Sequence, residues 1–252
     1  MTSKNLKPTV IVGAGTVGLM LAHELVLNNK PLIIIEAGDE NLDFFKANEY
    51  KSIGKIHAGV QYGRAKAVGG TSNLWGGQLT EFIQEDIEGS NFDQPKWVIE
   101  WETIKKYYAK VYEKLKFTNT VPYTPQTLIE DEKSKESLEI FCSRWIKQPN
   151  FKFHYWEFLK YSSLVTIYTN ATVTGLEFNN NKCCKIIYSS NNITHTITDF
   201  ENIILANGTI EIIRLLLHNA KNNNVPYSSN KNIGLYFQDH LGFKVGEIKK
   251  SI

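Results

Sequence analysis

The segment that most constrains the fold is TVIVGAGTVGLMLAHEL, in which a short apolar run leads into three glycines and then a helical pattern. Residues 9–12 are β-branched and apolar, as in buried parallel strands, and residues 16–27 place apolar side chains at helical spacing. In such a unit Gly13 makes the turn, Gly15 lets a pyrophosphate approach the backbone, and Gly18 lets the helix pack on the strand. The segment therefore predicts a dinucleotide-binding fold.

The second strand ends on an acidic residue at the position that a dinucleotide requires. Residues 31–35 form another buried apolar run, and Glu36 follows it, eighteen residues after Gly18. A carboxylate there accepts hydrogen bonds from a ribose and repels a 2′-phosphate, so NADP is disfavoured. Thr16 and Val17 open the helix, whose unpaired N–H groups favour phosphate. Dinucleotide binding is the first functional expectation, and a glycine-rich turn without a ligand is the alternative.

Composition narrows the class of ligand. The chain has 252 residues, 42% of them hydrophobic, and its net charge of +2 arises from 28 basic and 26 acidic residues spread along the sequence. This distribution predicts no nucleic-acid partner and no binding to an anionic membrane. The apolar N-terminal stretch is too short for a transmembrane segment and has no signal-peptide cleavage site, so a cytoplasmic location is expected. Cys142, Cys183 and Cys184 fit neither a disulfide framework nor a metal site.

After Glu36 the order of elements departs from a simple NAD domain. Residues 63–78, GRAKAVGGTSNLWGGQ, are rich in glycine and have no helical or strand period. An amphipathic helix is predicted within residues 97–116, with Ile104, Tyr107, Tyr108, Val111, Tyr112 and Leu115 along one stripe, and residues 135–146 could form another. Later strands and a helix are predicted at residues 164–169, 171–178, 185–189, 192–197, 203–206 and 210–219. A β-meander in place of further strand–helix repeats favours a flavoprotein of the two-dinucleotide-binding type.

Six motifs in chain order carry a specific resemblance. GAGTVG, IIEAG, GRAKAVGGTSNLWGG, ATVTGLEF, IILANGTIEIIRLLL and NIGLYFQDHL together resemble the FAD-binding portion of the glucose-methanol-choline (GMC) oxidoreductases, in particular their sugar dehydrogenase and pyranose-oxidase-like branch. The resemblance implies an α/β, FAD/NAD(P)-binding Rossmann-like three-layer fold, with a parallel sheet plus a β-meander and with the substrate domain largely missing. It implies one discontinuous domain over residues 1–252, with a cofactor-binding core of 1–82 and 160–243 and a helical or irregular insertion at 83–159.

The resemblance also implies the cofactor contacts. The expected cofactor-binding residues are Gly13, Gly15, Thr16, Val17, Gly18, Glu36, Arg64, Gly69, Gly70, Thr71, Ser72, Asn73, Trp75, Gly76, Val173, Ala206 and Gly208. The first glycines hold the pyrophosphate, Glu36 holds the ribose, and the backbone of Val173 meets the adenine. The second glycine cluster runs under the ribityl chain toward the flavin ring. A core position is the alternative for Trp75, and a solvated position is the alternative for Arg64.

Departures from the family pattern limit the expected chemistry. Some members bond the flavin through a histidine before the tryptophan, but this chain has Leu74 there, so noncovalent FAD is expected. The family chains are about twice as long, and their later half supplies the catalytic histidine. None of His23, His57, His154, His195, His218 and His240 matches it, so no catalytic and no metal-binding residue is expected. His240, in an Asp-His pair, is expected to be structural.

Two functions remain open, and a third is disfavoured. The first is an FAD-dependent oxidoreductase acting on CH–OH groups of an alcohol or sugar, present as its N-terminal flavin-binding half and completed by a separately encoded partner chain. The second is a noncatalytic remnant, or a nucleotide-binding or interaction protein, that kept the fold and lost turnover. The glycine loop and the meander argue against an NAD-dependent enzyme with a single Rossmann unit.

Overall fold

The computed structural model of the protein describes residues 6–43, 53–54, 57–89, 95–116, 143–222 and 225–239. Its strands are β1 (Thr9–Val12), β2 (Leu32–Ile35), β3 (Gln78–Leu79), β4 (Arg144–Trp145), β5 (Val165–Tyr168), β6 (Ala171–Asn179), β7 (Lys182–Ser190), β8 (Ile193–Ile197) and β9 (Asn202–Leu205). Its helices are α1 (Thr16–Leu27), α2 (Ala58–Gln61), the 3-10 turn η1 (Gly70–Asn73), α3 (Gln84–Glu88), α4 (Trp101–Lys114), α6 (Phe151–Lys160) and α7 (Thr209–Asn222).

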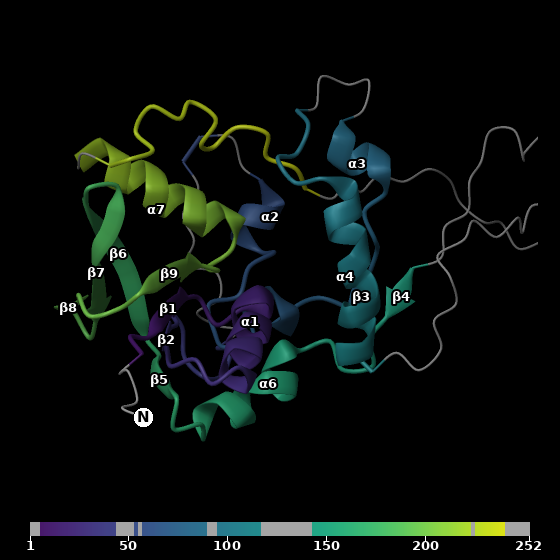
Figure 1. The fold of residues 1–252 in the computed structure, drawn as a ribbon, viewed down its shortest axis with the longest axis horizontal. Coiled ribbons are helices and arrows are strands. Elements are labelled where there is room, and N and C mark those ends of the chain that lie inside the picture. Colours follow the sequence, from purple (N-terminus) through teal and green to yellow (C-terminus); the bar gives the residue numbers. More distant parts are fainter. Residues whose placement is uncertain are drawn as a thin grey trace, which may run out of the picture.

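Four parallel strands form the central sheet, in the order β5-β2-β1-β9 (Figure 1). Val12 at the end of β1 pairs with Ile35 of β2 on one side and with Leu205 of β9 on the other. The segments that follow β1, β2 and β9 therefore leave the sheet side by side, at the carboxyl ends of the strands. The strands predicted at 9–12, 31–35, 164–169 and 203–206 are confirmed, each to within one residue at either end.

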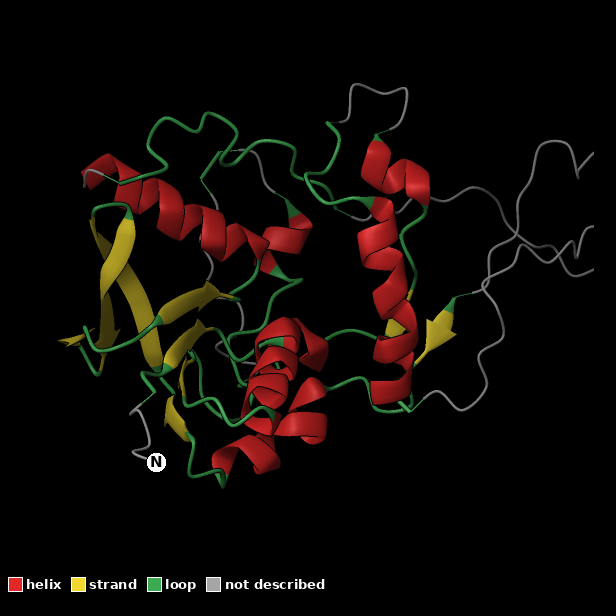
Figure 2. Ribbon diagram, in the orientation of Figure 1, coloured by secondary structure: helices red, strands yellow, loops and turns green. Residues whose placement is uncertain are grey.

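The sheet is covered on both faces, because consecutive side chains of β1 enter different cores. Ile11 packs in the core that contains α1 and α6, whereas Val10 and Val12 pack in the core that contains the β-meander. Apolar side chains on both faces are typical of parallel strands, and each buried aliphatic side chain stabilises the fold by about 1.5–3 kcal/mol. Figure 1 and Figure 2 show the resulting layers, with α1 and α6 on one side of the parallel sheet and the antiparallel strands and α7 on the other. The predicted three-layer α/β fold is confirmed.

Helix α6 contributes four buried side chains to the first core, at positions that share one helical face. They are Phe151, Tyr155, Trp156 and Leu159. The helix begins after Asn150, whose side-chain oxygen accepts a hydrogen bond from the backbone N–H of Lys152 at 2.9 Å. Residues 151–159 of this helix fall within the segment predicted as an insertion, yet the helix packs against α1. The division of the chain at residues 82 and 160 stays a prediction.

The meander is a three-stranded antiparallel sheet, in the order β6-β7-β8, and α7 is attached to it by the buried side chains of Leu215 and Asn219. Two asparagine pairs turn its hairpins: Asn180 and Asn181, and Asn191 and Asn192, all have positive φ, as two-residue hairpin loops require. Asn219 of α7 accepts a hydrogen bond from the Leu176 N–H (3.0 Å) and donates one to the Leu176 carbonyl (2.8 Å). Helix α7 is thereby fixed beside the sheet edge.

Two local expectations need correction. Tyr112 and Leu115 are buried as the helical stripe predicts, but Tyr107 is exposed, because it lies about 140° around α4 from Tyr112. Residues 144–145 form strand β4 instead of helix, because they pair with β3. Ser143 and Ile146 are not helical either, and residues 135–142 of that predicted helix lie outside the described residues, as does His240. Within the described ranges, no helix combines the length and the apolar character that crossing a membrane requires.

Candidate functional site

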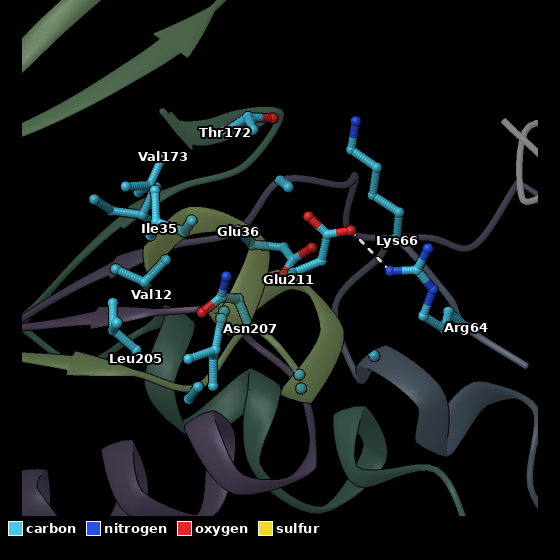
Figure 3. A pocket seen from close by; sticks show the side chains of 18 of the residues that line it. Val12, Ile35, Glu36, Arg64, Lys66, Thr172, Val173, Leu205, Asn207 and Glu211 are labelled. Carbon is cyan, nitrogen blue, oxygen red and sulfur yellow. Dashed lines mark hydrogen bonds and ion pairs between the residues drawn. The ribbon is translucent and has the colours of Figure 1, made fainter. Parts of the chain in front are cut away.

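A cavity of about 400 Å³ opens where β1, β2 and β9 end. Figure 3 shows its wall, with Val12, Ile35 and Leu205 from the three strand ends on one side and charged side chains on the other. In open parallel sheets the crevice beyond the carboxyl ends of the strands is the usual place for a ligand. The position of the cavity therefore agrees with the expectation from the glycine motif.

Gly13 and Gly18 are required by close packing around the turn between β1 and α1. Gly13 has φ +100°, and a Cβ atom there would lie 2.6 Å from the Ala206 carbonyl oxygen. A Cβ atom at Gly18 would lie 2.0 Å from the Gly13 carbonyl oxygen. Gly18 does not line the cavity, so its role in the structure is to bring helix and strand together.

Helix α1 presents its N-terminus to the cavity without a local partner for its backbone. Its N-cap residue, Gly15, offers no side-chain hydrogen bond, and the first turn contains no acidic residue. Thr16 and Val17 line the cavity, and the Val17 side chain is exposed. Free N–H groups and the positive end of the helix dipole make such a terminus a binding site for phosphate.

Glu36 is a buried carboxylate that already holds the loops around it. Its Oε2 accepts a hydrogen bond from the Ala14 N–H and its Oε1 accepts one from the Gly38 N–H, both at 2.8 Å. Burial raises the pKa of this carboxyl group above its ordinary value, and the two backbone N–H groups oppose that rise. Each carboxylate oxygen retains a further lone pair for a ligand. Glu36 therefore joins the glycine turn to the cavity wall.

The second glycine cluster lies against the first. A Cβ atom at Gly70 would lie 2.8 Å from the Gly15 Cα, and the Gly69 N–H donates to the Ala14 carbonyl at 2.8 Å. The polar side chains that follow are used inside the protein: Ser72 accepts a hydrogen bond from the Phe151 N–H, and Asn73 accepts one from Asn150. The loop is thus tied to α6 on one side and to the glycine turn on the other.

The structure gathers most of the predicted cofactor-binding residues around one cavity. Those that line it are Gly13, Gly15, Thr16, Val17, Glu36, Arg64, Gly70, Thr71, Val173, Ala206 and Gly208. Those outside its lining are Gly18, Gly69, Ser72, Asn73, Trp75 and Gly76. The Trp75 indole donates to the Pro149 carbonyl at 2.7 Å, and Gly76 lies against the Trp145 ring. The assignment of these residues to a cofactor stays a prediction.

Several lining residues were not expected from the sequence. Lys66, Asn207 and Glu211 are neighbours of predicted residues, and their position beside the motifs was the available signal. The Arg64 guanidinium pairs with the Glu211 carboxylate at 2.7 Å (Figure 3). Burial would raise the pKa of Glu211, but the ion pairs with Arg64 and Arg214 hold it below its ordinary value. The Oδ1 atom of Asn207 is buried without a hydrogen-bond donor.

A second cavity of about 200 Å³ adjoins the first. The two cavities share Arg64, Thr71, Asn207, Gly208, Thr209 and Glu211. Glu36 and Val173 line the first cavity and are absent from the second, whereas Phe237 and Asp239 line the second alone. The two cavities therefore adjoin at Arg64, Thr71 and the β9–α7 connection, and Glu36 belongs to the first cavity.

The fold is shared with flavin-dependent oxidases, whereas no protein-family model and no curated protein matches the sequence. Pyridoxine 4-oxidase from Mesorbium loti aligns with a TM-score of 0.55 at 16% identity, over 85% of this chain and 52% of its own. A fungal aryl-alcohol oxidase aligns with a TM-score of 0.56 at 16% identity, over 86% of this chain and 48% of the oxidase chain. An FAD-dependent oxidoreductase from Chaetomium thermophilum aligns with a TM-score of 0.57 at 16% identity, over 85% of this chain and 47% of the oxidoreductase chain.

The chain thus spans about half the length of the solved structures that it matches. The identities are low, so the likeness concerns the fold. The protein therefore has the fold of the FAD-binding portion of the GMC-type oxidoreductases, and the resemblance that its motifs carry is confirmed at that level.

Proposed function

We propose that this chain binds FAD noncovalently in the cavity at the strand ends and is the flavin-binding portion of an oxidoreductase acting on CH–OH groups. The observation that carries the proposal is the convergence of the α1 N-terminus, Glu36 and the second glycine cluster on one cavity. Proteins with this fold are named as an FAD-dependent oxidoreductase and as oxidases of pyridoxine and aryl alcohols, which supports the reaction class.

The cavity wall fits the parts of FAD in order. Gly13 and Gly15, with the α1 N-terminus, would hold the pyrophosphate through backbone N–H groups. Glu36 would accept hydrogen bonds from the adenosine ribose, with Val173 beside the adenine. Gly70 and Thr71 would face the ribityl chain.

The described residues supply the flavin-binding part of the chemistry. Bound FAD supplies an acceptor for the hydride of a substrate C–H bond, and a base must remove the hydroxyl proton. Among the described residues that line the two cavities there is no histidine. The base would therefore come from a further protein segment, on this polypeptide or on a separately encoded partner chain.

A covering segment has apolar surface to contact. Phe82, Trp97 and Trp145 are all at least 44% exposed, and Phe82 and Trp97 are paired at a ring distance of 5.6 Å. Large exposed aromatic side chains of this kind mark surfaces that associate with other protein segments.

The alternative function is that of a noncatalytic nucleotide-binding protein. The lack of a histidine in the described cavity walls favours this alternative as well.

The test is reconstitution with FAD, followed by removal of free FAD by gel filtration. We expect a yellow protein whose flavin is released by heat denaturation, because Leu74 stands where a covalent link would form. Anaerobic reduction by primary alcohols or sugars, with and without a candidate partner chain, then separates an oxidoreductase from a noncatalytic binder. A preparation that stays colourless in excess FAD would contradict the proposal.

A further inference from the structure

The proposed ribose contact depends on the charged form of a buried carboxyl group. Burial raises the pKa of Glu36, because a charge is less favourable away from water, and the hydrogen bonds from the Ala14 and Gly38 N–H groups oppose that rise. A protonated carboxyl group has lost its charge and accepts hydrogen bonds more weakly than a carboxylate. A nearby positive charge would therefore strengthen the ribose contact.

Lys66 lies beside Glu36 because the loops that carry the two residues are paired. The Val68 N–H donates to the Asp39 carbonyl at 2.9 Å. A Cβ atom at Gly38 would lie 2.1 Å from the Lys66 carbonyl oxygen, so the two loops approach as closely as a glycine permits. The backbone of Lys66 is thus fixed next to the loop that follows Glu36, and both residues line the first cavity.

Among the described residues that line this cavity, Lys66 is the one cation that forms no ion pair with another of them. Arg64 and Arg214 both pair with Glu211, at 2.7 Å and 2.6 Å. Figure 3 shows the Lys66 side chain extending away from this cluster. The side chain is exposed, so its charge stays hydrated and carries no desolvation cost. Its positive charge favours the ionised form of Glu36.

Two further titratable side chains lie on the described segments that adjoin Glu36, and neither supplies a positive charge. They are Asp39, in the loop after β2, and Tyr168, at the end of β5. A tyrosine hydroxyl is not positive in either protonation state, and a second carboxylate opposes the ionisation of the first. Lys66 is therefore the cation available to balance Glu36 within the described part of the chain.

We propose that Lys66 is a positioning residue, whose ammonium keeps the Glu36 carboxylate charged and thereby able to accept hydrogen bonds from the ribose of the bound dinucleotide. The assignment rests on the proposed binding of FAD. A direct contact between the two side chains is not required, because attraction between charges extends over about 10 Å at 0.1 M salt. Lys66 thus acts on the ligand through Glu36.

The first experiment needs no ligand. The side-chain carboxyl carbon of Glu36 is titrated by NMR in the full-length apoprotein, with Glu36→Gln used to assign the signal. We expect the midpoint to be higher in Lys66→Met than in the wild type, and to return toward the wild-type value in Lys66→Arg, which restores the charge. Lys30→Met is the control, because it removes an exposed lysine outside both cavities and should leave the midpoint unchanged.

The second experiment measures FAD affinity across a pH series by flavin fluorescence. Affinity that depends on a carboxylate is present above the pKa of that group and is lost as the pH falls through it, so a higher pKa moves the loss to higher pH. We expect Lys66→Met to bind FAD about two- to fivefold more weakly than the wild type at mildly acidic pH. The difference should disappear at alkaline pH, where Glu36 is ionised in both proteins.

A double-mutant cycle separates action through Glu36 from direct contact with the ligand. In the Glu36→Gln background no carboxylate remains to be kept charged, so adding Lys66→Met should change FAD affinity by less than about twofold at every pH. Lys66→Gln repeats the whole test if the methionine variant does not fold.

Two outcomes would overturn the inference while leaving FAD binding intact. One is a Glu36 titration that is the same in Lys66→Met and the wild type. The other is a loss of FAD affinity that is equal at all pH values and persists in the Glu36→Gln background, which would show that Lys66 binds the ligand directly. Wild-type protein that binds no FAD would refute the proposed function and the ribose contact with it, whereas the titration by itself decides whether Lys66 keeps Glu36 charged.

Discussion

At the scale of single residues, Glu36 joins structure and ligand binding in one side chain. Its two oxygens accept hydrogen bonds from the Ala14 and Gly38 N–H groups, so it organises the glycine turn before any ligand is bound. The sequence predicts the ribose contact from the position of Glu36. Only the tertiary structure shows that the same carboxylate satisfies two backbone donors.

The variant Glu36→Ala should therefore lose both stability and affinity. We expect the free energy of unfolding of the apoprotein to fall by about 2 kcal/mol, because two buried N–H groups lose their acceptor. FAD affinity should fall about ten- to a hundredfold from the lost ribose bonds. Urea denaturation and fluorescence titration measure the two effects. Glu40→Ala, which removes the ion pair with Lys160 at a position outside the cavity lining, is the control for FAD affinity. Unchanged FAD affinity in Glu36→Ala would refute the ribose role.

The carboxylate of Glu211 should give the protein a defined pH dependence. Ion pairs with Arg64 and Arg214 lower its pKa in the folded state below the ordinary value of 4.5. A carboxyl group with a lowered folded pKa contributes stability that is present above its unfolded pKa and lost as the pH falls through the folded pKa. Glu211 therefore stabilises the apoprotein at neutral pH and ceases to do so in acid.

We expect Glu211→Gln to lower the free energy of unfolding by about 1–2 kcal/mol at neutral pH, because a half-buried ion pair is lost. The difference from the wild type should shrink as the pH falls below about 4.5. Urea denaturation across a pH series measures this difference, with the exposed Glu201→Gln as the control variant. A difference that stays constant with pH would contradict the role of the ion pairs.

At the scale of elements, two glycines of the β1–α1 turn, Gly15 and Gly18, differ in what surrounds them. A Cβ atom at Gly18 would meet the Gly13 carbonyl at 2.0 Å, whereas a Cβ atom at Gly15 would have no atom nearer than the Gly70 Cα at 3.8 Å. Gly15 lines the cavity and Gly18 does not. We infer that Gly15 is required by the proposed ligand. Gly18 is required by the packing of the helix on the strand.

Gly15→Ala and Gly18→Ala should consequently separate binding from folding. Gly18→Ala should lower the free energy of unfolding by about 1–3 kcal/mol through overpacking. Gly15→Ala should change stability by less than about 1 kcal/mol, yet lower FAD affinity at least about tenfold, because its methyl group occupies the place of the pyrophosphate. Gly175→Ala, whose methyl group would lie 3.4 Å from the Ile187 side chain and 3.8 Å from the Asn219 Oδ1, is the control for a tolerated glycine. Equal FAD affinity in Gly15→Ala and the wild type would place the phosphates elsewhere.

The elements themselves were largely predictable where hydrophobic pattern and glycine or asparagine turns agreed. The β1–α1–β2 unit and the hairpins follow directly from the alternation of apolar runs and turn residues. Strand β4 was not predictable, because two residues form a strand only when Gln78 and Leu79 lie beside them. A contact between residues so distant in sequence leaves no local signal.

At the scale of the whole molecule, the proposed ligand would connect the layers of the fold. The cavity is lined by residues from β1, β2, β6, β9 and α7 and from the loop that carries Arg64. A ligand that binds these parts in the folded state alone stabilises the entire fold through mass action. The stability of the protein should therefore report binding even without turnover.

We expect FAD at about a hundred times its Kd to stabilise the protein by about 2.7 kcal/mol and to raise its Tm by about 5–10 °C. Scanning fluorimetry or circular dichroism measures the shift. The Gly15→Ala variant should show a smaller shift at the same FAD concentration. A wild-type Tm that does not respond to FAD would contradict a binding site built from these layers.

The sequence alone determined the first β–α–β unit, the glycine turn and the acidic residue after β2, because each depends on residues close together in the chain. It also determined the family resemblance, through motifs in a fixed order. Only the tertiary structure decided which polar groups share a cavity. The Arg64–Glu211 pair joins residues 147 positions apart, and the unpaired Asn207 oxygen depends on every neighbour around it. Hydrogen-bond satisfaction is a property of the packed chain, so no local pattern can carry it.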